Sequence, residues 1–526
     1  MANVTTVSST LAMAGLASPV AGNTVFLTEA GREGIFECFS GTPPSDPEKG
    51  LYVVSSTTGF YWARNWDGIH GKPEWFGAIL GGPDCLPALK ACVALCPVTS
   101  LARGDYYISS TWKVQAPYRT VQGVGLSDGY TSASGTRVLC NNDSTSVFQV
   151  GADIQPPSVN DYLRGVRVKD INFEHSGRLT APSSPINATK CVVATYLLDC
   201  EFDRVYTWEP LIGIFMYGCV GTFFRRCKAF RSMSQLGSDF FYGFWGYGTP
   251  AILNGGNASL YVEDCSVELG NALSITKIGL YLNGEAADLF VDRFETSAAT
   301  NGIVYAASGS GAYGMQDVFF RDCVLDQCSG PAIDISGLNA QAAITIDGGY
   351  FQAKSSAQTV IKASGGGAVT ICGGAQIICA EAGATYGVYG NGQKNLTIDP
   401  SVKITDCPYG VSMDGDCSGS QILCRISNPL IGNGTTYAIA LNSSSKRVRI
   451  VPMIDGKDDG FAQMIFLIGT GQDACFIDPT GVDLAATSSS VKVLINASGI
   501  STPGYYNSSG APGTTGAGIQ VTGITV

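Results

Sequence analysis

The sequence predicts an all-β chain built as a parallel β-helix, in which short strands are wound coil upon coil. Three observations lead to this fold class: a six-residue phrase that recurs along most of the chain, a composition rich in turn residues, and the lack of a helical pattern between the phrases. Of 526 residues, 66 are glycine, 45% are hydrophobic and only 14% are charged. This composition is typical of a β-rich globular chain and not of a disordered one.

The recurring phrase reads apolar, any, apolar, any, turn residue, apolar. Its third residue falls at positions 168, 202, 224, 262, 291, 320, 346, 371, 398, 424, 450 and 476, and the last six steps lie between 25 and 27 residues. Strand alternation at such a period indicates a solenoid whose neighbouring coils pair in parallel. We therefore expect one inward ladder made of Ile346, Ile371, Ile398, Cys424, Ile450 and Phe476.

Period-two alternation directs the first and third residues of each phrase inward, and the second and fourth outward. Cys227, Cys265 and Cys323 share the sixth position, so we expect them to be buried and reduced core residues. A disulfide between neighbouring coils is the lesser alternative, because parallel Cβ vectors at rung spacing are not its preferred geometry. The 18 cysteines contain no CxxC pair and only two histidines accompany them, so the sequence predicts no metal site and no cofactor.

The charge balance excludes some classes of function. A formal net charge of −11 argues against a nucleic-acid partner, which requires clustered lysine and arginine. The first 22 residues have no basic segment before their apolar stretch, and no run of about 18 apolar residues follows, so neither export nor membrane insertion is expected. Synthesis in a reducing cytoplasm is the expectation that follows.

The segment before the coils resembles a known family. Residues 72–78 (KPEWFGA), 101–108 (LARGDYYI) and 121–125 (VQGVG) resemble the stretch that leads into the β-helix of pectate-lyase-superfamily bacteriophage tail spikes. Residues 82–95 take the place of that family's acidic loop and capping helix, with Asp84 as the loop acid. The doubled aspartate of the family is reduced here to Pro-Asp-Cys, which matters little if the loop only caps the coils.

The resemblance implies a right-handed parallel β-helix, pectate-lyase-like and homotrimeric, located in a virion and made in the host cytoplasm. It implies three parts: residues 1–75 for virion attachment within a small β domain, residues 76–480 for the parallel β-helix, and residues 481–526 as a C-terminal strand segment that locks the trimer. Its expected partners are other virion tail or collar proteins and bacterial surface polysaccharide. The resemblance alone does not imply catalysis.

Two outward rows of the phrase are candidates for function. The second position carries Phe223, Tyr261, Phe290 and Phe319, and this aromatic row could pack in the trimer, stack on glycan or lie under a loop.

The fourth position carries Arg225, Glu263, Asp292 and Arg321, which could form a ladder of salt bridges. Alternatively Glu263 with Asp292, or Glu263 with Glu295, is the carboxylate pair of glycoside hydrolysis, and these three acids are the candidate catalytic residues.

Residues 238–256 form the longest apparent insertion and hold six aromatics among glycines. Aromatic faces on such a loop stack on sugar rings, so Tyr242, Trp245 and Tyr247 are candidate carbohydrate-binding residues, together with Trp208 on a nearby coil. A buried cap is the alternative reading. Residues 125–129 match the G-x-S-x-G pattern, but their glycine-turn context and a single later histidine argue against a serine hydrolase.

The sequence thus predicts a phage tail spike or fibre that binds host surface polysaccharide and could depolymerise it by hydrolysis. The alternatives are a non-enzymatic collar, fibre or decoration protein of the virion, and a polysaccharide lyase. A lyase needs cations near a uronate carboxylate, and the sequence offers no obvious cluster of them.

Overall fold

The computed structural model describes residues 5–125, 135–142, 144–175, 187–231, 240–248, 257–269, 275–284, 286–306, 316–354, 359–379, 385–427, 437–442, 447–455, 463–470, 476–477, 493–498 and 519–522. These residues form two compact units. The first unit holds those up to 231 except 216–220, and the second holds 216–220 and those from 240 onward. Within the described ranges, no helix has the length and apolar character needed to cross a membrane.

The first unit begins with a sheet of five strands in the order β1-β2-β3-β5-β4. The strands are β1 (Thr5–Val7), β2 (Thr24–Leu27), β3 (Gly34–Ser40), β4 (Tyr52–Val54) and β5 (Phe60–Arg64). Helix α1 (Thr10–Ala14) places Met13 against one face of the sheet, in a core that includes Phe36 and Trp62. Alternation along the strands leaves Phe26, Ile35, Phe39 and Val54 exposed.

Two short helices follow, η1 (Pro73–Phe76) and α2 (Leu86–Leu95). The predicted capping helix is confirmed as α2. The loop acid Asp84 fixes its start, because Asp84 Oδ1 accepts a hydrogen bond from the backbone N–H of Leu86 at 3.0 Å. Its Oδ2 accepts one from the Ser109 hydroxyl at 2.7 Å, so the same carboxylate ties the helix to the first coil.

Parallel strands make up the rest of the first unit. They are β6 (His70–Gly71), β7 (Val98–Ser100), β8 (Gly104–Ile108), β9 (Trp112–Val114), β10 (Thr120–Gln122), β11 (Thr136–Cys140), β12 (Phe148–Gly151), β13 (Leu163–Arg164), β14 (Arg167–His175), β15 (Lys190–Leu198), β16 (Glu201–Trp208), β18 (Phe223–Arg225) and β19 (Lys228–Arg231). A short helix, η2 (Val159–Asp161), interrupts them, and β17 (Ile212–Val220) has residues in both units.

The second unit continues the same coil pattern. Its strands are β20 (Phe240–Tyr247), β21 (Asn257–Glu263), β22 (Ser266–Leu269), β23 (Thr276–Asn283), β24 (Ala286–Asp292), β25 (Glu295–Ser297), β26 (Asn301–Ala306), β27 (Gln316–Arg321), β28 (Val324–Cys328), β29 (Ile333–Leu338), β30 (Ala343–Asp347), β31 (Tyr350–Ala353), β32 (Thr359–Gly365), β33 (Ala368–Cys372), β34 (Gln376–Cys379), β35 (Tyr386–Asn391), β36 (Leu396–Ile398), β37 (Lys403–Thr405), β38 (Tyr409–Asp414), β39 (Gln421–Ile422), β40 (Arg425–Ser427), β41 (Tyr437–Asn442), β42 (Arg449–Ile450), β43 (Met453–Asp455), β44 (Gln463–Thr470), β45 (Phe476–Ile477), β46 (Val493–Ser498) and β47 (Ile519–Thr522).

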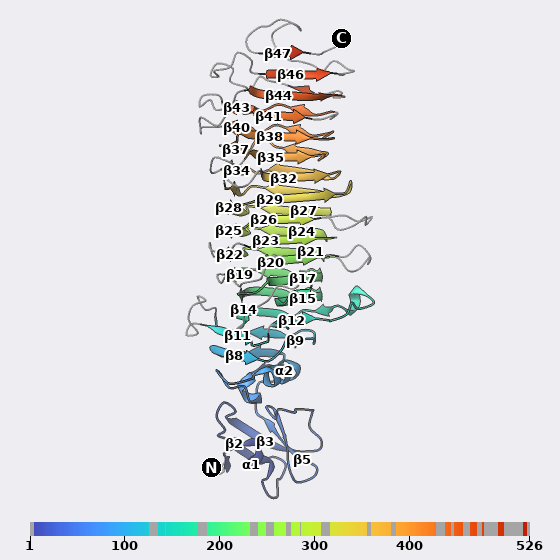
Figure 1. Ribbon diagram of the computed structural model, residues 1–526. Coiled ribbons are helices and arrows are strands. Elements are labelled where there is room, and N and C mark those ends of the chain that lie inside the picture. Colours follow the sequence, from blue (N-terminus) through green and yellow to red (C-terminus); the bar gives the residue numbers. More distant parts are fainter. Residues whose placement is uncertain are drawn as a thin grey trace. The chain divides into compact units, whose positions relative to one another are not determined.

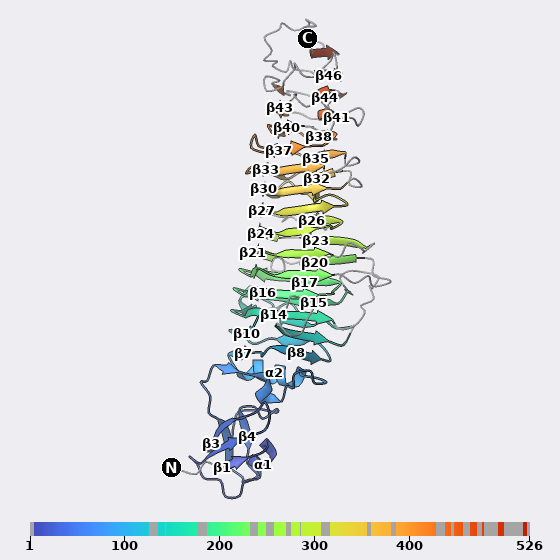
Figure 2. The same ribbon diagram turned by 90° about the vertical axis from the view of Figure 1, so that its left-hand side faces the viewer.

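From β20 to β42, each strand pairs in parallel with the strand three places later, which is its equivalent on the next coil. Examples are β21 with β24, β24 with β27 and β27 with β30. The strands of each unit therefore stack as successive coils (Figures 1 and 2). The predicted fold class, an all-β parallel β-helix, is confirmed. Its interior is filled by the apolar first and third residues of the phrases, which are nearly all buried.

The predicted inward ladder is correct in its first half and shifts in its second. Ile346, Ile371 and Ile398 are register partners, as expected. The next partners are Ile422 and Ile450, followed by Ile477, so the predicted members Cys424 and Phe476 are wrong. At Ile422 and Cys424 two apolar residues fit the same alternation, and at residues 476–477 two apolar residues are adjacent, so periodicity alone cannot choose between them.

In many coils left-handed backbone turns the chain from one strand into the next. In the second unit the turn residue has a φ of 53° at Asp264, 51° at Arg293 and 48° at Asp322, and the two following coils use pairs of glycines, at 348–349 and 373–374. Glycine avoids the steric cost of that conformation. At Gly373 a Cβ would also lie 1.8 Å from Oδ1 of Asp347, so a side chain cannot be accommodated without movement.

The predicted division of the chain into residues 1–75, 76–480 and 481–526 stays a prediction. The five-stranded sheet ends at Arg64, and strands β46 and β47 pair in parallel with each other beyond residue 480. Most of residues 481–526 lie outside the described part.

The thiols offer a test of the inward register. Cys227, Cys265 and Cys323 are at most 1% exposed, and burial raises the pKa of Cys323 to about 12. We expect a thiol reagent to leave all three unmodified in native protein and to label them after unfolding, since only the accessible thiolate reacts. Partly exposed Cys372 is the internal control and should react first. Rapid native labelling of Cys265, mapped by peptide mass, would contradict the register.

Candidate functional site

The outer face of strands β21, β24 and β27 carries a row of stacked rings. We call Tyr261, Phe290 and Phe319 the aromatic row. They are register partners on three consecutive coils, with ring centroids 5.0 and 5.2 Å apart and planes within 7° of parallel. All three rings are partly exposed. The row therefore forms a continuous apolar strip on an otherwise polar surface. Phe223, predicted to begin this row, lies on β18 in the first unit.

A second row runs beside the aromatic row, two residues further along each strand and thus on the same face. We call Glu263, Asp292 and Arg321 the charged row. Register pairs Glu263 with Asp292 and Asp292 with Arg321. Neighbouring strands lie about 4.8 Å apart, so the predicted carboxylate pair is brought together on adjacent coils.

The surroundings of Asp292 favour its protonated form. Burial raises the pKa of this carboxyl, and Glu263 raises it further, while the guanidinium groups of Arg321 and Arg293 oppose the shift. The side chain is only 19% exposed, and its Oδ2 lies 3.9 Å from Nη1 of Arg321. Among the described residues its buried Oδ1 has no hydrogen-bond partner. A carboxyl with a raised pKa beside a second carboxylate is the arrangement of a general acid.

Arg321 joins the two rows. Its guanidinium carbon lies 5.2 Å from the ring centroid of Phe319 and 5.5 Å from that of Phe290, within the range of cation–π attraction. Because the same guanidinium also faces Asp292, the two rows form one surface. An apolar ring, a carboxylate and a cation then lie side by side. In sugar binding, such groups contact the CH faces, the hydroxyls and the acidic substituents of the sugar, respectively.

Glu295 lies apart from the pair. It begins β25, beyond the turn at Arg293, and its register partners are Ser266 and Val324. The structure therefore places Glu295 in a different column of strands from Glu263. Strand register therefore does not pair Glu263 with Glu295.

The aromatic segment that was expected to be an inserted loop is a strand of the coil. Residues 240–247 form β20 and pair with β23 along their length, so the loop expectation is wrong for them. Residues 238–239 and 249–256 lie outside the described part. In sequence, glycines interleaved with aromatic residues look the same in a buried strand as in a flexible loop. Here they serve close packing, because a Cβ on Gly243 would lie 2.4 Å from a methyl of Val267.

Trp245 is buried within this strand. It is 3% exposed, and rings of Tyr242, Tyr247 and Tyr281 surround it at centroid distances of 5.6 to 5.9 Å. A ring so enclosed has no free face for a sugar in this conformation. The three tyrosines are partly exposed, and burial raises the pKa of Tyr242 to about 12. Trp245 thus supports a tyrosine surface, of which Tyr281 was missed by the sequence reasoning.

Trp208 ends strand β16 in the first unit. It is 6% exposed, and its ring lies 4.3 Å from that of Phe230. Its register partner on the preceding coil is Glu174, whose pKa is raised by burial. Arg137 contacts Glu174 at 3.3 Å and binds Asp105 through two bonds of 2.8 Å.

This second acidic centre was also missed. Strand alternation continues beyond the turn at Asp170, with Ile171 and Phe173 pointing inward. This alternation is the sequence signal that places Glu174 on the outer face. Within the described ranges, no three His, Cys, Asp or Glu residues converge as metal ligands. Of the G-x-S-x-G pattern only Gly125 is described, so that motif lies outside the structural evidence.

No protein-family model matches the sequence, and no curated protein is similar to it. Solved structures are similar in fold. Tailspike protein 3 of bacteriophage CBA120 is 13% identical, and the superposition covers 85% of this chain and 66% of that one with a TM-score of 0.51. This chain has the parallel β-helix fold of phage tailspikes.

Other tailspikes align along most of the chain at a similar level of identity. The tailspike of Acinetobacter phage vb_AbaP_AS12 is 12% identical over 91% of this chain and 75% of its own, with a TM-score of 0.49. Full-length tailspike protein 2 of an Escherichia coli O157:H7 bacteriophage is 13% identical over 90% of this chain, with a TM-score of 0.38. The chain spans about half the length of that protein, with 51% covered. At these identities no site residue is transferred to this chain.

The raised pKa of Asp292 has a measurable consequence. Ionised Asp292 destabilises the folded chain, because its pKa is higher in the folded than in the unfolded state. The stability that protonation contributes is complete below the unfolded pKa, about 4, and is lost as pH rises through the folded pKa. We expect Asp292→Asn to raise the thermal midpoint at pH 7 and the gain to shrink on acidification. Exposed Asp317→Asn is the control. A gain that grows on acidification would contradict the assignment.

Proposed function

We propose that this protein is a tailspike or fibre of a bacteriophage and that it binds the surface polysaccharide of the host bacterium. The observation that carries the proposal is the joint face of the aromatic and charged rows on a tailspike fold. Partly exposed rings provide apolar area for sugar CH groups, and the adjoining carboxylates and guanidinium accept and donate hydrogen bonds to hydroxyls. A solved structure with this fold, tailspike protein 3 of bacteriophage CBA120, is a tailspike by name.

Depolymerisation by hydrolysis is the enzymatic part of the proposal. Glycoside hydrolysis uses two carboxyl groups, one of them protonated, and a separation near 5 Å is that of the retaining mechanism. Asp292 has the raised pKa of a general acid, and Glu263 on the adjacent coil serves as nucleophile or electrostatic partner. Arg321 faces Asp292 and lowers its pKa, which limits the rise that burial causes. Glu295 has no role in this assignment.

A homotrimer is part of the same proposal, with residues 1–75 joined to other virion proteins. The aromatic row could serve that assembly instead of glycan, because stacked and partly exposed rings also suit a contact between copies. The two uses differ in what truncation does. Loss of a trimer contact lowers oligomeric mass, whereas loss of a glycan contact leaves it unchanged.

We expect Phe290→Ala to weaken binding to the host polysaccharide by about 1 to 3 kcal/mol, the contribution of one aromatic side chain. Tyr281→Ala tests the tyrosine surface around Trp245 in the same way. Phe39→Ala, which removes an exposed ring from the five-stranded sheet, should bind like wild type. Binding is measured on bacterial capsule and O-antigen preparations, with oligomeric mass recorded for each variant. Normal binding by both Phe290→Ala and Tyr281→Ala would overturn the placement of the site.

Catalysis is tested separately from binding. We expect Asp292→Asn and Glu263→Gln each to retain binding and to lower the rate of polysaccharide cleavage by at least about a hundredfold, the usual share of a general acid or base. New reducing ends report hydrolysis, and absorbance of an unsaturated uronate reports elimination. If both variants cleave like wild type, the acids serve only as ladder partners of Arg321. If wild type binds without cleaving any preparation, the protein is a non-enzymatic fibre or collar component.

A further inference from the structure

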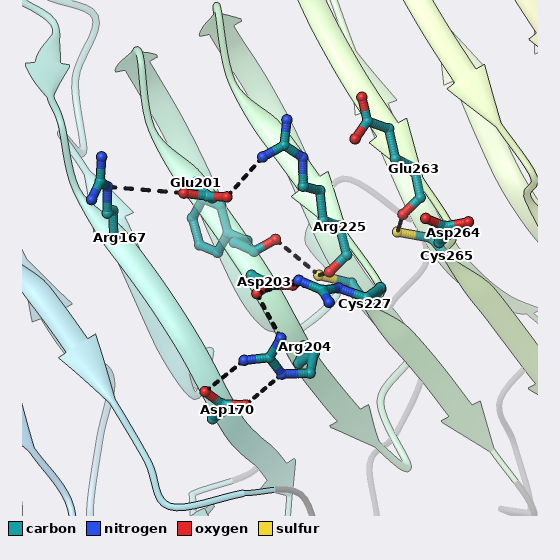
Figure 3. A network of polar contacts seen from close by, with 12 residues as sticks. Arg167, Asp170, Glu201, Asp203, Arg204, Arg225, Cys227, Glu263, Asp264 and Cys265 are labelled. Atoms are coloured by element: carbon teal, nitrogen blue, oxygen red, sulfur yellow. Dashed lines mark hydrogen bonds and ion pairs between the residues drawn. The ribbon is translucent and has the colours of Figure 1, made fainter.

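The first unit carries a charged surface along three consecutive coils, formed by residues 167–170 of β14, 201–204 of β16 and 225–228 of β18 and β19. Figure 3 shows its side chains arranged along these strands, with Arg167, Glu201 and Arg225 in one line. We call this surface the arginine patch. Its bases and acids are Arg167, Lys169, Arg204, Arg225, Arg226 and Lys228 against Asp170, Glu201 and Asp203.

The acids of the arginine patch are shared between bases. Glu201 lies 3.0 Å from Nη1 of Arg225 and 3.9 Å from Nε of Arg167. Asp203 accepts two bonds of 2.7 and 2.9 Å from Arg226, and a third group, Nη1 of Arg204, lies 2.9 Å away. Each of these carboxylates therefore contacts two guanidinium groups, and residues 167–170, 201–204 and 225–228 together carry six bases and three acids.

The acidic side chains of the arginine patch are less exposed than its basic ones. The carboxylates of Asp203 and Asp170 are 14% and 22% exposed. The guanidinium-bearing side chains of Arg226 and Arg167 are 53% and 68% exposed. The acids thus lie beneath and the bases above them, so the outermost layer of the patch is positive although the whole chain has a net charge of −11.

The internal ion pairs indicate which anion fits. Arg204 holds Asp170 by two bonds of 2.6 and 2.9 Å, and Arg226 holds Asp203 in the same two-point manner. The planar fork of arginine matches a carboxylate in this geometry. The carboxylates of the patch therefore already orient the guanidinium groups. Their outward N–H groups can donate hydrogen bonds to a further carboxylate without reorganisation.

Rings accompany the cations. The Arg225 guanidinium lies 4.3 Å from the ring centroid of Phe223, and the Lys228 ammonium lies 5.9 Å from that of Tyr206. A surface that alternates cations with apolar rings suits a carbohydrate whose sugar rings carry carboxylates. It suits duplex nucleic acid less, because the acidic remainder of the chain repels a long polyanion.

We propose that the arginine patch binds carboxylate-bearing sugars, so that the polysaccharide recognised by this protein is acidic. The inference rests on the proposed function and specifies its substrate class.

The test uses full-length protein and an array of purified bacterial capsule and O-antigen polysaccharides, some containing uronates and others neutral. We expect binding to be confined to carboxylate-bearing polysaccharides. For the tightest of them, Arg167→Gln with Arg226→Gln should raise Kd at least tenfold and flatten its salt dependence. Chemical reduction of the uronate carboxyls to alcohols should have a similar effect on wild type. The matched control, Lys113→Gln with Lys394→Gln, removes two charges from exposed ion pairs elsewhere and should stay within twofold.

Several outcomes would overturn the inference. Tight binding of a neutral polysaccharide, unchanged in the arginine variant, refutes the acidic substrate class and leaves the proposed function intact. Loss of oligomeric mass in the arginine variant assigns the patch to a contact between copies. Binding of duplex DNA or of anionic lipid vesicles in preference to every polysaccharide assigns it to another polyanion. If wild type binds no polysaccharide on the array, the proposed function fails and the inference fails with it.

Discussion

In-register parallel pairing between coils is the interaction on which the other features of this protein depend. It stacks each side chain on its equivalent one coil away, at about 4.8 Å. Inside, the result is an apolar ladder such as Ile346, Ile371 and Ile398. Outside, stacking like charges is costly, so the outward residues alternate in sign. Such alternating contacts are Asp170 with Arg204, Glu201 with Arg225, Asp264 with Arg293, Asp292 with Arg321 and Asp334 with Lys362.

Departures from this alternation single out the two surfaces to which we assign function. Glu263 and Asp292 are carboxylates in register, and burial together with their mutual repulsion raises the pKa of Asp292. Arg204 and Arg226 occupy equivalent turns one coil apart, held over a shared Asp203. Both arrangements retain unfavourable proximity between like charges. A sugar carboxylate placed among the guanidinium groups relieves the repulsion in the arginine patch, and a proton held on Asp292 relieves the repulsion between the two carboxyl groups.

The repeat made the fold and the carboxylate pair predictable, because equal spacing in sequence becomes register in space. Periodicity could not resolve Ile422 from Cys424, since both fit the alternation, nor distinguish strand β20 from a loop when glycine and aromatics are mixed. It also could not reveal burial, and Trp245 is enclosed although Tyr242 and Tyr247 of the same strand are partly exposed. The arginine patch escaped notice because its cations are scattered over 62 positions in sequence, from Arg167 to Lys228, and only the coil brings them together.

A structure of the protein with a fragment of its host polysaccharide bound tests the central claim most directly. The account predicts sugar residues against Phe290 and Phe319, with a glycosidic oxygen within hydrogen-bond distance of Asp292. It also predicts a sugar carboxylate on the guanidinium groups of Arg167 or Arg226. Sugar bound away from both surfaces, with the aromatic row covered by a second copy of the chain, would contradict it.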